Sequence, residues 1–170
     1  MWTFGDSALP AETTVFYAHS SSNVRVFNIH LPFSNSQIFW DAPDRISRDA
    51  EDPEFKGSWA HWVFTKNATS GIMNIYRNGQ LWHSGTNRFA TIDTISGARI
   101  GSALGNRFYN GMIDEVALYN VALSPAEVTA LYEESNIFGL VGSTQFSTSK
   151  SETPPSVSST DLGQTEFLNS

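Results

Sequence analysis

The chain has 170 residues, no cysteine and a formal net charge of −7. Without cysteine there can be no disulfide bond and no thiolate-ligated metal, and the acidic balance argues against a nucleic-acid partner, which needs a basic face. No apolar run approaches the ~20 residues that cross a bilayer, so we expect no membrane insertion. The first residues lack the basic and apolar regions of a signal peptide, and we interpret the chain as a fragment whose first strands are missing.

Short β-type segments follow one another from the N-terminus, at residues 13–21, 24–33, 36–42 and 59–66. The third and fourth are separated by a charged stretch, residues 42–58, which we expect to be a loop because it contains two prolines and a glycine. Many short strands separated by turn signals, with no alternation of strand and helix, predict an all-β protein. The predicted architecture is an antiparallel β-sandwich of two sheets.

Asn78 and Gly79 lie between two apolar runs and predict a tight hairpin. Asn-Gly supplies the two positive-φ positions of a type I′ turn, whose twist matches that of paired strands. The predicted register pairs Arg77 with Gln80, Tyr76 with Leu81, and Ile75 with Trp82.

Two further strands are predicted at residues 97–102 and 112–119, and the only convincing helix follows them. Ser124 is a suitable N-cap, Pro125 suits the first helical position, and Glu127 completes a capping box. We expect this helix to end near Glu134 and, because it is too short to be stable alone in water, to lie against an apolar surface. Residues 1–142 would form the domain, and the Ser/Thr/Pro-rich residues 143–170 a flexible tail.

Four motifs recur in the order of a known family: "WAHWVF" at residues 59–64, "IYRNGQLW" at 75–82, "ARIGS" at 98–102 and "YNGMIDEVALYNVALSPAEVTALY" at 109–132. Together they resemble the laminin-G-like domain of the concanavalin A-like lectin/glucanase class. The resemblance implies a jelly roll that serves as a non-catalytic recognition or adhesion module. It also implies that the helix covers one end of the sandwich and that a last strand returns at residues 136–142. Such a module would bind a glycan or a partner protein, outside the cell or on its surface.

Two alternatives to this function stay open: an accessory domain of a secreted glycoside hydrolase or sialidase, and a structural spacer. Catalysis is not expected, because glycosidases need two carboxylates that face one another. Asp114 and Glu115 are adjacent on a predicted strand and so point to opposite faces. We expect Asp114 to be half-buried and to pair with an arginine such as Arg99.

The loops flanking the strand at 97–102 contain the candidate ligand-binding residues. Sugar recognition combines an aromatic ring with amide or guanidinium groups, and loops at the rim of a sandwich carry such sites. The candidates are Asn87, Arg88, Asn106, Arg107 and Tyr109. Calcium is a cofactor that relatives sometimes use, and Asp93 is the candidate ligand for it, although the loop at 102–110 has no acid. Nothing in the sequence indicates an oligomeric state.

Overall fold

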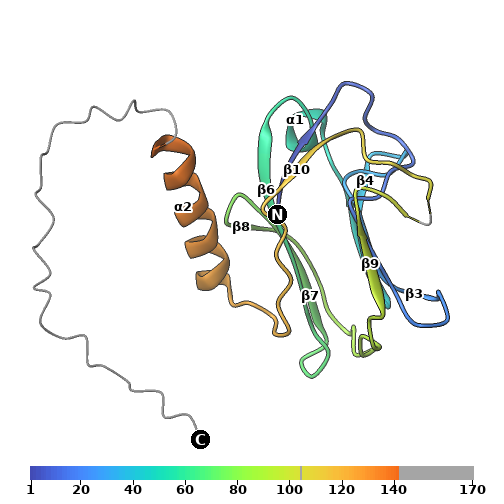
Figure 1. The fold of residues 1–170 in the computed structure, drawn as a ribbon. Coiled ribbons are helices and arrows are strands. Elements are labelled where there is room, and N and C mark those ends of the chain that lie inside the picture. Colours follow the sequence, from blue (N-terminus) through green and yellow to red (C-terminus); the bar gives the residue numbers. More distant parts are fainter. Residues whose placement is uncertain (104, 142–170) are drawn as a thin grey trace, which may run out of the picture.

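The computed structural model describes residues 1–103 and 105–141, with side chains up to residue 135. Two antiparallel five-stranded sheets pack face to face, and one helix lies outside them (Figure 1). Sheet A has the order β10 (Gly111–Asp114), β1 (Trp2–Gly5), β6 (Trp59–Asn67), β7 (Ile72–Arg77) and β8 (Gln80–Gly85). Sheet B has the order β5 (Asp44–Asp49), β4 (Gln37–Ala42), β3 (Arg25–His30), β2 (Phe16–His19) and β9 (Gly97–Ile100). The predicted two-sheet sandwich is confirmed.

The core is formed by the facing surfaces of the two sheets. Across sheet B, Phe16, Ile29, Trp40 and Ile46 are direct cross-strand neighbours, and each is almost completely buried. Trp62 and Ile75 of sheet A are also buried. Trp40 Nε1 donates a hydrogen bond to the Thr65 carbonyl at 3.1 Å, which ties one sheet to the other. Because alternate residues of a strand face opposite ways, the neighbours of these core residues form the outer faces.

The helix α2 (Pro125–Val141) begins with the predicted capping box. Ser124 N donates to Glu127 Oε2 at 2.7 Å, and Glu127 N donates to Ser124 Oγ at 3.3 Å. The helix lies against the outer face of sheet A, where Tyr132 contacts Trp2 and His61, rather than across an opening between the sheets. Of the helices in the described part of the chain, none has the length and apolar character needed to cross a membrane.

The prediction of a last strand at residues 136–142 is wrong. Residues 136–141 continue α2 instead of returning to a sheet. Once a helix is nucleated, each added residue gains one backbone hydrogen bond, and neither proline nor an N-cap motif interrupts the chain there. Gly142 and the predicted tail at 143–170 lie outside the described residues.

The predicted charged loop at residues 42–58 contains two elements that the sequence did not reveal. They are β5 and the short helix α1 (Asp52–Phe55). In β5 only Ile46 points into the core, while its neighbours are charged or polar. An edge strand of this kind needs few apolar residues, because one side of it faces solvent.

Smaller differences concern the predicted strand at 112–119 and the hairpin. β10 ends at Asp114, whose Oδ1 accepts a hydrogen bond from Glu115 N, and Arg99 forms no ion pair with it among the described residues. The predicted pairs of Arg77 with Gln80 and of Tyr76 with Leu81 are confirmed. A bulge next to Ile75 then shifts the register by one residue, so that Ile75 faces His83 and not Trp82.

Candidate functional site

A row of polar side chains crosses the outer face of sheet B, opposite the core. One residue from each strand of sheet B contributes to this row, and each is the direct cross-strand neighbour of the next. In order across the sheet they are Arg99, Tyr17, Asn28, Asp41 and Arg45. Along each strand these residues alternate with the residues that point into the core, so all five lie on the outer face of sheet B. We call this surface, with the flanking side chains described next, the polar face.

Asp41 is the centre of the polar face. Its carboxylate, with a side chain only 3% exposed, accepts hydrogen bonds from two arginines. Arg45 Nη2 lies 2.8 Å from Asp41 Oδ2, and Arg45 Nε bonds to Oδ1. Arg25 Nη1 lies 3.4 Å from the same Oδ2. The arginine side chains are 48% and 52% exposed, so the buried carboxylate holds two guanidinium groups that solvent can reach.

His30 occupies the next position along β3 on the same face, and it is buried. Its Nδ1 lies 2.5 Å from the Thr13 carbonyl and its Nε2 lies 2.9 Å from Asn28 Nδ2. Burial lowers the pKa of His30, and the hydrogen bond to Thr13 opposes that effect only in part. The imidazole is therefore neutral at pH 7. Asn28 Oδ1 is buried and has no hydrogen-bond partner.

Two phenylalanine rings flank His30 at the edge of the polar face. Phe33 and Phe39 are half-buried, and their centroids lie 4.8 and 5.9 Å from that of His30. Arg45 lies over the Phe39 ring at 4.8 Å, and Arg107 lies over the Phe33 ring at 5.8 Å. Partly exposed rings next to guanidinium and amide groups are suited to a ligand with apolar faces and polar edges.

The family model Laminin_G_3, described as the concanavalin A-like lectin/glucanases superfamily, matches residues 2–129. The chain belongs to this family. Comparison with curated proteins finds no match.

Solved structures with the same fold include domain 4 of AbnA, a GH43 extracellular arabinanase from Geobacillus stearothermophilus, in complex with arabinotriose. It is 25% identical, with a TM-score of 0.58, over 77% of this chain and 63% of that chain. A Bacteroides ovatus protein described as carbohydrate binding is 18% identical, with a TM-score of 0.58, over 75% of this chain and 38% of that chain. A SAP-like pentraxin from Limulus polyphemus is 16% identical, with a TM-score of 0.53, over 71% of this chain and 62% of that chain.

The Laminin_G_3 fold separates the predicted ligand-binding residues into two groups. The loop at residues 86–96 leads into β9, and the loop at 101–110 leaves it, so the two loops lie at opposite ends of that strand. The expectation that both loops share one rim is wrong. Sequence proximity was misleading here, because a single strand crosses the whole sandwich.

Arg107 is the predicted residue that lies beside the polar face, through its contact with Phe33. Asn106 is exposed next to it and forms a short backbone bridge with Ala103. Tyr109 is turned inward: its hydroxyl is buried, and burial raises its pKa. Of this group, Arg107 and Asn106 are accessible to a ligand, and the Tyr109 hydroxyl is not.

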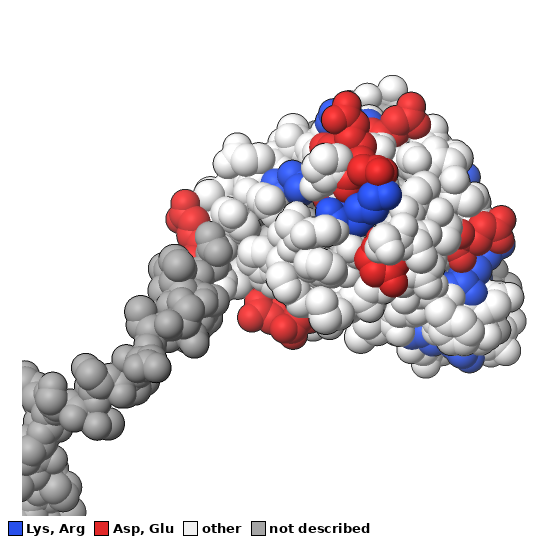
Figure 2. Space-filling model, turned by 90° about the horizontal axis from the view of Figure 1, so that it is seen from above, with Lys and Arg blue, Asp and Glu red and all other residues white. Residues whose placement is uncertain are grey.

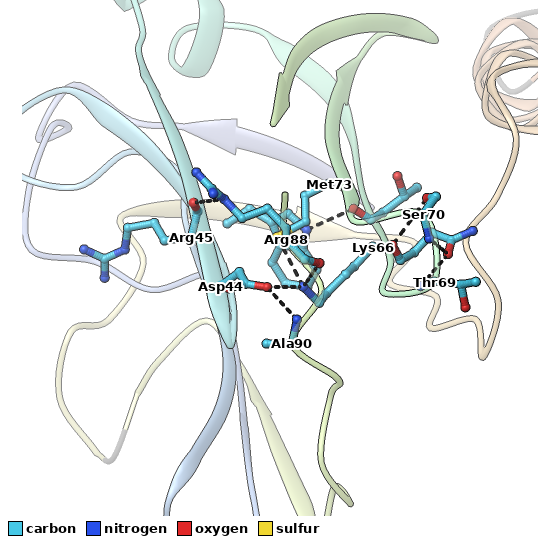
Figure 3. A network of polar contacts seen from close by, with 11 residues as sticks. Asp44, Arg45, Lys66, Thr69, Ser70, Met73, Arg88 and Ala90 are labelled. Carbon is cyan, nitrogen blue, oxygen red and sulfur yellow. Dashed lines mark hydrogen bonds and ion pairs between the residues drawn. The ribbon is translucent and has the colours of Figure 1, made fainter. Parts of the chain in front are cut away.

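Arg88 lies at the far end of the sandwich and has structural partners (Figure 3). Its Nε donates to the Arg45 carbonyl at 3.1 Å, and its own carbonyl accepts from Lys66 Nζ at 3.0 Å. Lys66 also pairs with Asp44 at 2.9 Å. Arg88 thus fastens the loop at 86–96 to the sandwich, whereas Asn87 is exposed beside it.

Asp93, the predicted calcium ligand, is exposed in the same loop, and its Oδ1 accepts from Thr94 N at 2.7 Å. Within residues 1–103 and 105–141, no three His, Asp or Glu side chains lie together in a way that could hold a metal ion. A calcium site at Asp93 would therefore depend mainly on backbone carbonyls.

A sizeable apolar cavity lies elsewhere, beside β6. It measures about 740 Å³, and its walls include Trp40, Phe64, Val116 and Leu118. Hydroxyl-rich ligands need convergent polar groups, which this lining provides poorly. The polar face is thus the better candidate site. One signal for it was visible in the sequence: the polar residues Asn28 and His30 stand at alternate positions of a predicted strand.

Proposed function

We propose that this protein is a non-catalytic module that binds glycans through the polar face of sheet B. The carrying observation is the cross-strand row from Arg99 to Arg45, with the Phe33 and Phe39 rings beside it. Sugars present apolar ring faces, which stack on aromatic side chains, and hydroxyl edges, which bond to guanidinium and amide groups. The family supports this function as a class, since concanavalin A-like folds include lectins.

The absence of catalysis is part of the proposal. Glycoside hydrolysis uses a pair of carboxylates on either side of the scissile bond. On the polar face the central carboxylate is Asp41, and two arginines already occupy its oxygens. A buried carboxylate held in this way is not free to approach a glycosidic oxygen.

A second candidate is narrower: an accessory domain of an extracellular glycoside hydrolase. It is favoured by the similarity to domain 4 of an extracellular GH43 arabinanase bound to arabinotriose, at 25% identity. Both candidates place the protein outside the cell. Binding to the polysaccharide that a linked catalytic domain cleaves would support the narrower role, whereas binding only to glycans of a host surface would contradict it.

A glycan array with purified protein tests the main proposal. We expect binding to at least one oligosaccharide class, and we expect Phe39→Ala and Arg107→Ala to weaken it without lowering the melting temperature. Asn87→Ala, in the loop at the other end of β9 from Arg107, is the comparison variant and should bind normally. Loss of binding in the Asn87 variant alone would move the site to the loop at 86–96. Repeating the array with calcium and with a chelator tests the Asp93 site.

A further inference from the structure

The polar face carries positive charge although the chain is acidic. Four of the ten Lys and Arg residues of the sequence lie on it or at its edge: Arg25, Arg45, Arg99 and Arg107. The strand pattern places two carboxylates on the same face, those of Asp41 and Asp49. The chain as a whole has a net charge of −7. The four arginines thus outnumber the two carboxylates that the strand pattern places on this face, although the chain as a whole is acidic.

The view from above fits this distribution. Figure 2 shows charged side chains in a few places on a mostly uncharged surface. Lys and Arg side chains appear at the upper centre of the view and on its right-hand side, where sheet B lies in Figure 1, and acidic side chains lie near them in both places.

The Asp41 carboxylate cannot neutralise both arginines that it holds. It carries one negative charge, and Arg25 and Arg45 together carry two positive charges. The carboxylate is buried and fixes the guanidinium groups in place, so their free N–H groups are already oriented before a ligand arrives. A pair of oriented guanidinium groups binds a carboxylate or sulfate with charge-assisted hydrogen bonds.

The other two arginines have no acidic partner. The ion pairs within the described part of the chain are those of Arg25 and Arg45 with Asp41, of Lys56 with Asp52, and of Lys66 with Asp44. Arg99 and Arg107 are exposed and take part in none of them. Arg107 instead lies over Phe33, where an aromatic surface and a free guanidinium group meet.

A buried amide beneath the arginines also lacks a partner. Asn28 is 2% exposed, and its Oδ1 accepts no hydrogen bond. Such a group costs free energy when it is left unsatisfied, and native proteins rarely keep one without a reason. Asn28 is the direct cross-strand neighbour of Asp41, so this unsatisfied amide lies in the same row as the carboxylate that holds the two arginines.

We infer that the polar face selects acidic glycans, those whose sugars carry a carboxylate or a sulfate. This rests on the proposed function and narrows its ligand class. The acidic group lies between the guanidinium groups of Arg25 and Arg45, and the sugar ring lies toward Phe39. Arg99, at one end of the row, and Arg107, which lies over Phe33, engage further acidic groups.

Pairs of oligosaccharides that differ only in their acidic groups show whether binding depends on the charge or on the sugar. Calorimetric titration would use oligogalacturonate and its methyl ester, and a heparin oligosaccharide and its desulfated form. We expect at least one acidic glycan to bind about tenfold or more tightly than its neutral counterpart, and that preference to shrink as salt is raised from about 50 to about 300 mM. The carboxylated and sulfated arms show which acidic group is preferred.

Variants that remove a single positive charge test whether the preference for acidic glycans comes from the polar face. Arg45→Gln and Arg99→Gln should each weaken acidic-glycan binding about tenfold, and Arg99, which is exposed and unpaired, should do so without a change in melting temperature. Arg48→Gln removes the same charge from β5 but on the other side of the strand, where Arg48 lies over Trp82 at 4.5 Å, and should have no effect.

Each of the following outcomes would overturn the inference. Equal affinity for an acidic glycan and its neutral form would show that the protein does not recognise the acidic group. An equal effect of Arg48→Gln shows that the charge acts from elsewhere. Equal affinity for a double-stranded DNA oligonucleotide shows that the surface recognises any polyanion. Binding of neutral glycans alone leaves the proposed function standing and removes this inference, whereas no binding to any glycan removes both.

Discussion

Gly79, in the turn between β7 and β8, lies directly against the ring of Tyr132 in α2. A Cβ atom on Gly79 would stand 3.1 Å from Tyr132 Cδ1, and the Gly79 carbonyl accepts a hydrogen bond from Thr129 Oγ1 at 3.0 Å. The same residue adopts φ = +77°, as a type I′ turn requires. The turn that reverses the chain is therefore also the surface on which the helix rests.

Gly79→Val should lower the free energy of unfolding by about 1–3 kcal/mol, because a β-branched residue resists positive φ and its side chain would displace Tyr132. Gly57→Val is the matched control. Gly57 has φ = +78°, but a Cβ atom added there would have no other atom within 4 Å. Urea unfolding measures the loss of unfolding free energy in both variants. The loss in Gly57→Val reports the cost of the positive φ alone, and any additional loss in Gly79→Val reports the contact with α2. Equal losses would show that Tyr132 adapts freely.

Val128→Ala should destabilise the protein by about 1.5–3 kcal/mol, since Val128 is completely buried where α2 meets the sandwich. Val121→Ala makes the same chemical change at a residue that is 65% exposed, and should leave stability unchanged. Denaturant unfolding measures both. Should Val128→Ala also be neutral, α2 would be contributing little to the fold.

Lys66→Met should release the loop at 86–96. The Lys66 side chain is 2% exposed and joins Asp44 to the Arg88 carbonyl, while Asp44 Oδ2 also accepts from Ala90 N at 3.0 Å. Methionine keeps most of the length of the side chain but loses the hydrogen bonds that Lys66 Nζ donates to Asp44 and to the Arg88 carbonyl. We expect faster proteolysis within the loop, read by mass spectrometry, at temperatures where β6 and β7 remain protected from hydrogen exchange. Unchanged cleavage would mean that Arg88 suffices as the anchor.

His61 should make the protein less stable in mild acid. Burial lowers its pKa from 6.5 to about 4, and the N-terminal ammonium group adds to this effect. Because the folded state resists protonation of His61, its contribution to stability is complete above pH 6.5 and is lost as the pH falls toward 4. Replacement with phenylalanine, His61→Phe, should reduce the loss of stability between about pH 7 and pH 5, measured by urea unfolding.

Part of that loss should remain in His61→Phe, since burial also lowers the pKa of His30 and His83. Their effects have the same sign. A variant with the full wild-type pH dependence would show that His61 is accessible to protons in the folded protein.

Local signals in the sequence were sufficient for much of the fold. The Asn78-Gly79 pair dictates its turn through backbone φ alone, and Ser124 with Glu127 dictates the start of α2 through hydrogen bonds only three residues apart. The β5 strand was missed because it carries a single core residue, Ile46. The bulge next to Ile75 was missed because the Asn-Gly turn sets the register only of the residues nearest to it, and no sequence signal marked the shift.

The candidate site was harder to predict because it has no local motif. Its central row takes one residue from each of five strands, in an order, β9 to β2 to β3 to β4 to β5, that differs from their order in the chain. Asp41 and Arg45 are four residues apart in sequence, yet they meet only because β4 and β5 pair in one register. Arg107 was predicted, since its loop could be recognised without knowledge of the sheet.

The position of α2 also determines how the module can be held. The helix occupies the outer surface of one sheet, and the arginine-bearing surface belongs to the other, so the two lie back to back across the thickness of the sandwich. A partner that binds α2 would therefore approach from the side opposite the arginines and would leave the polar face accessible.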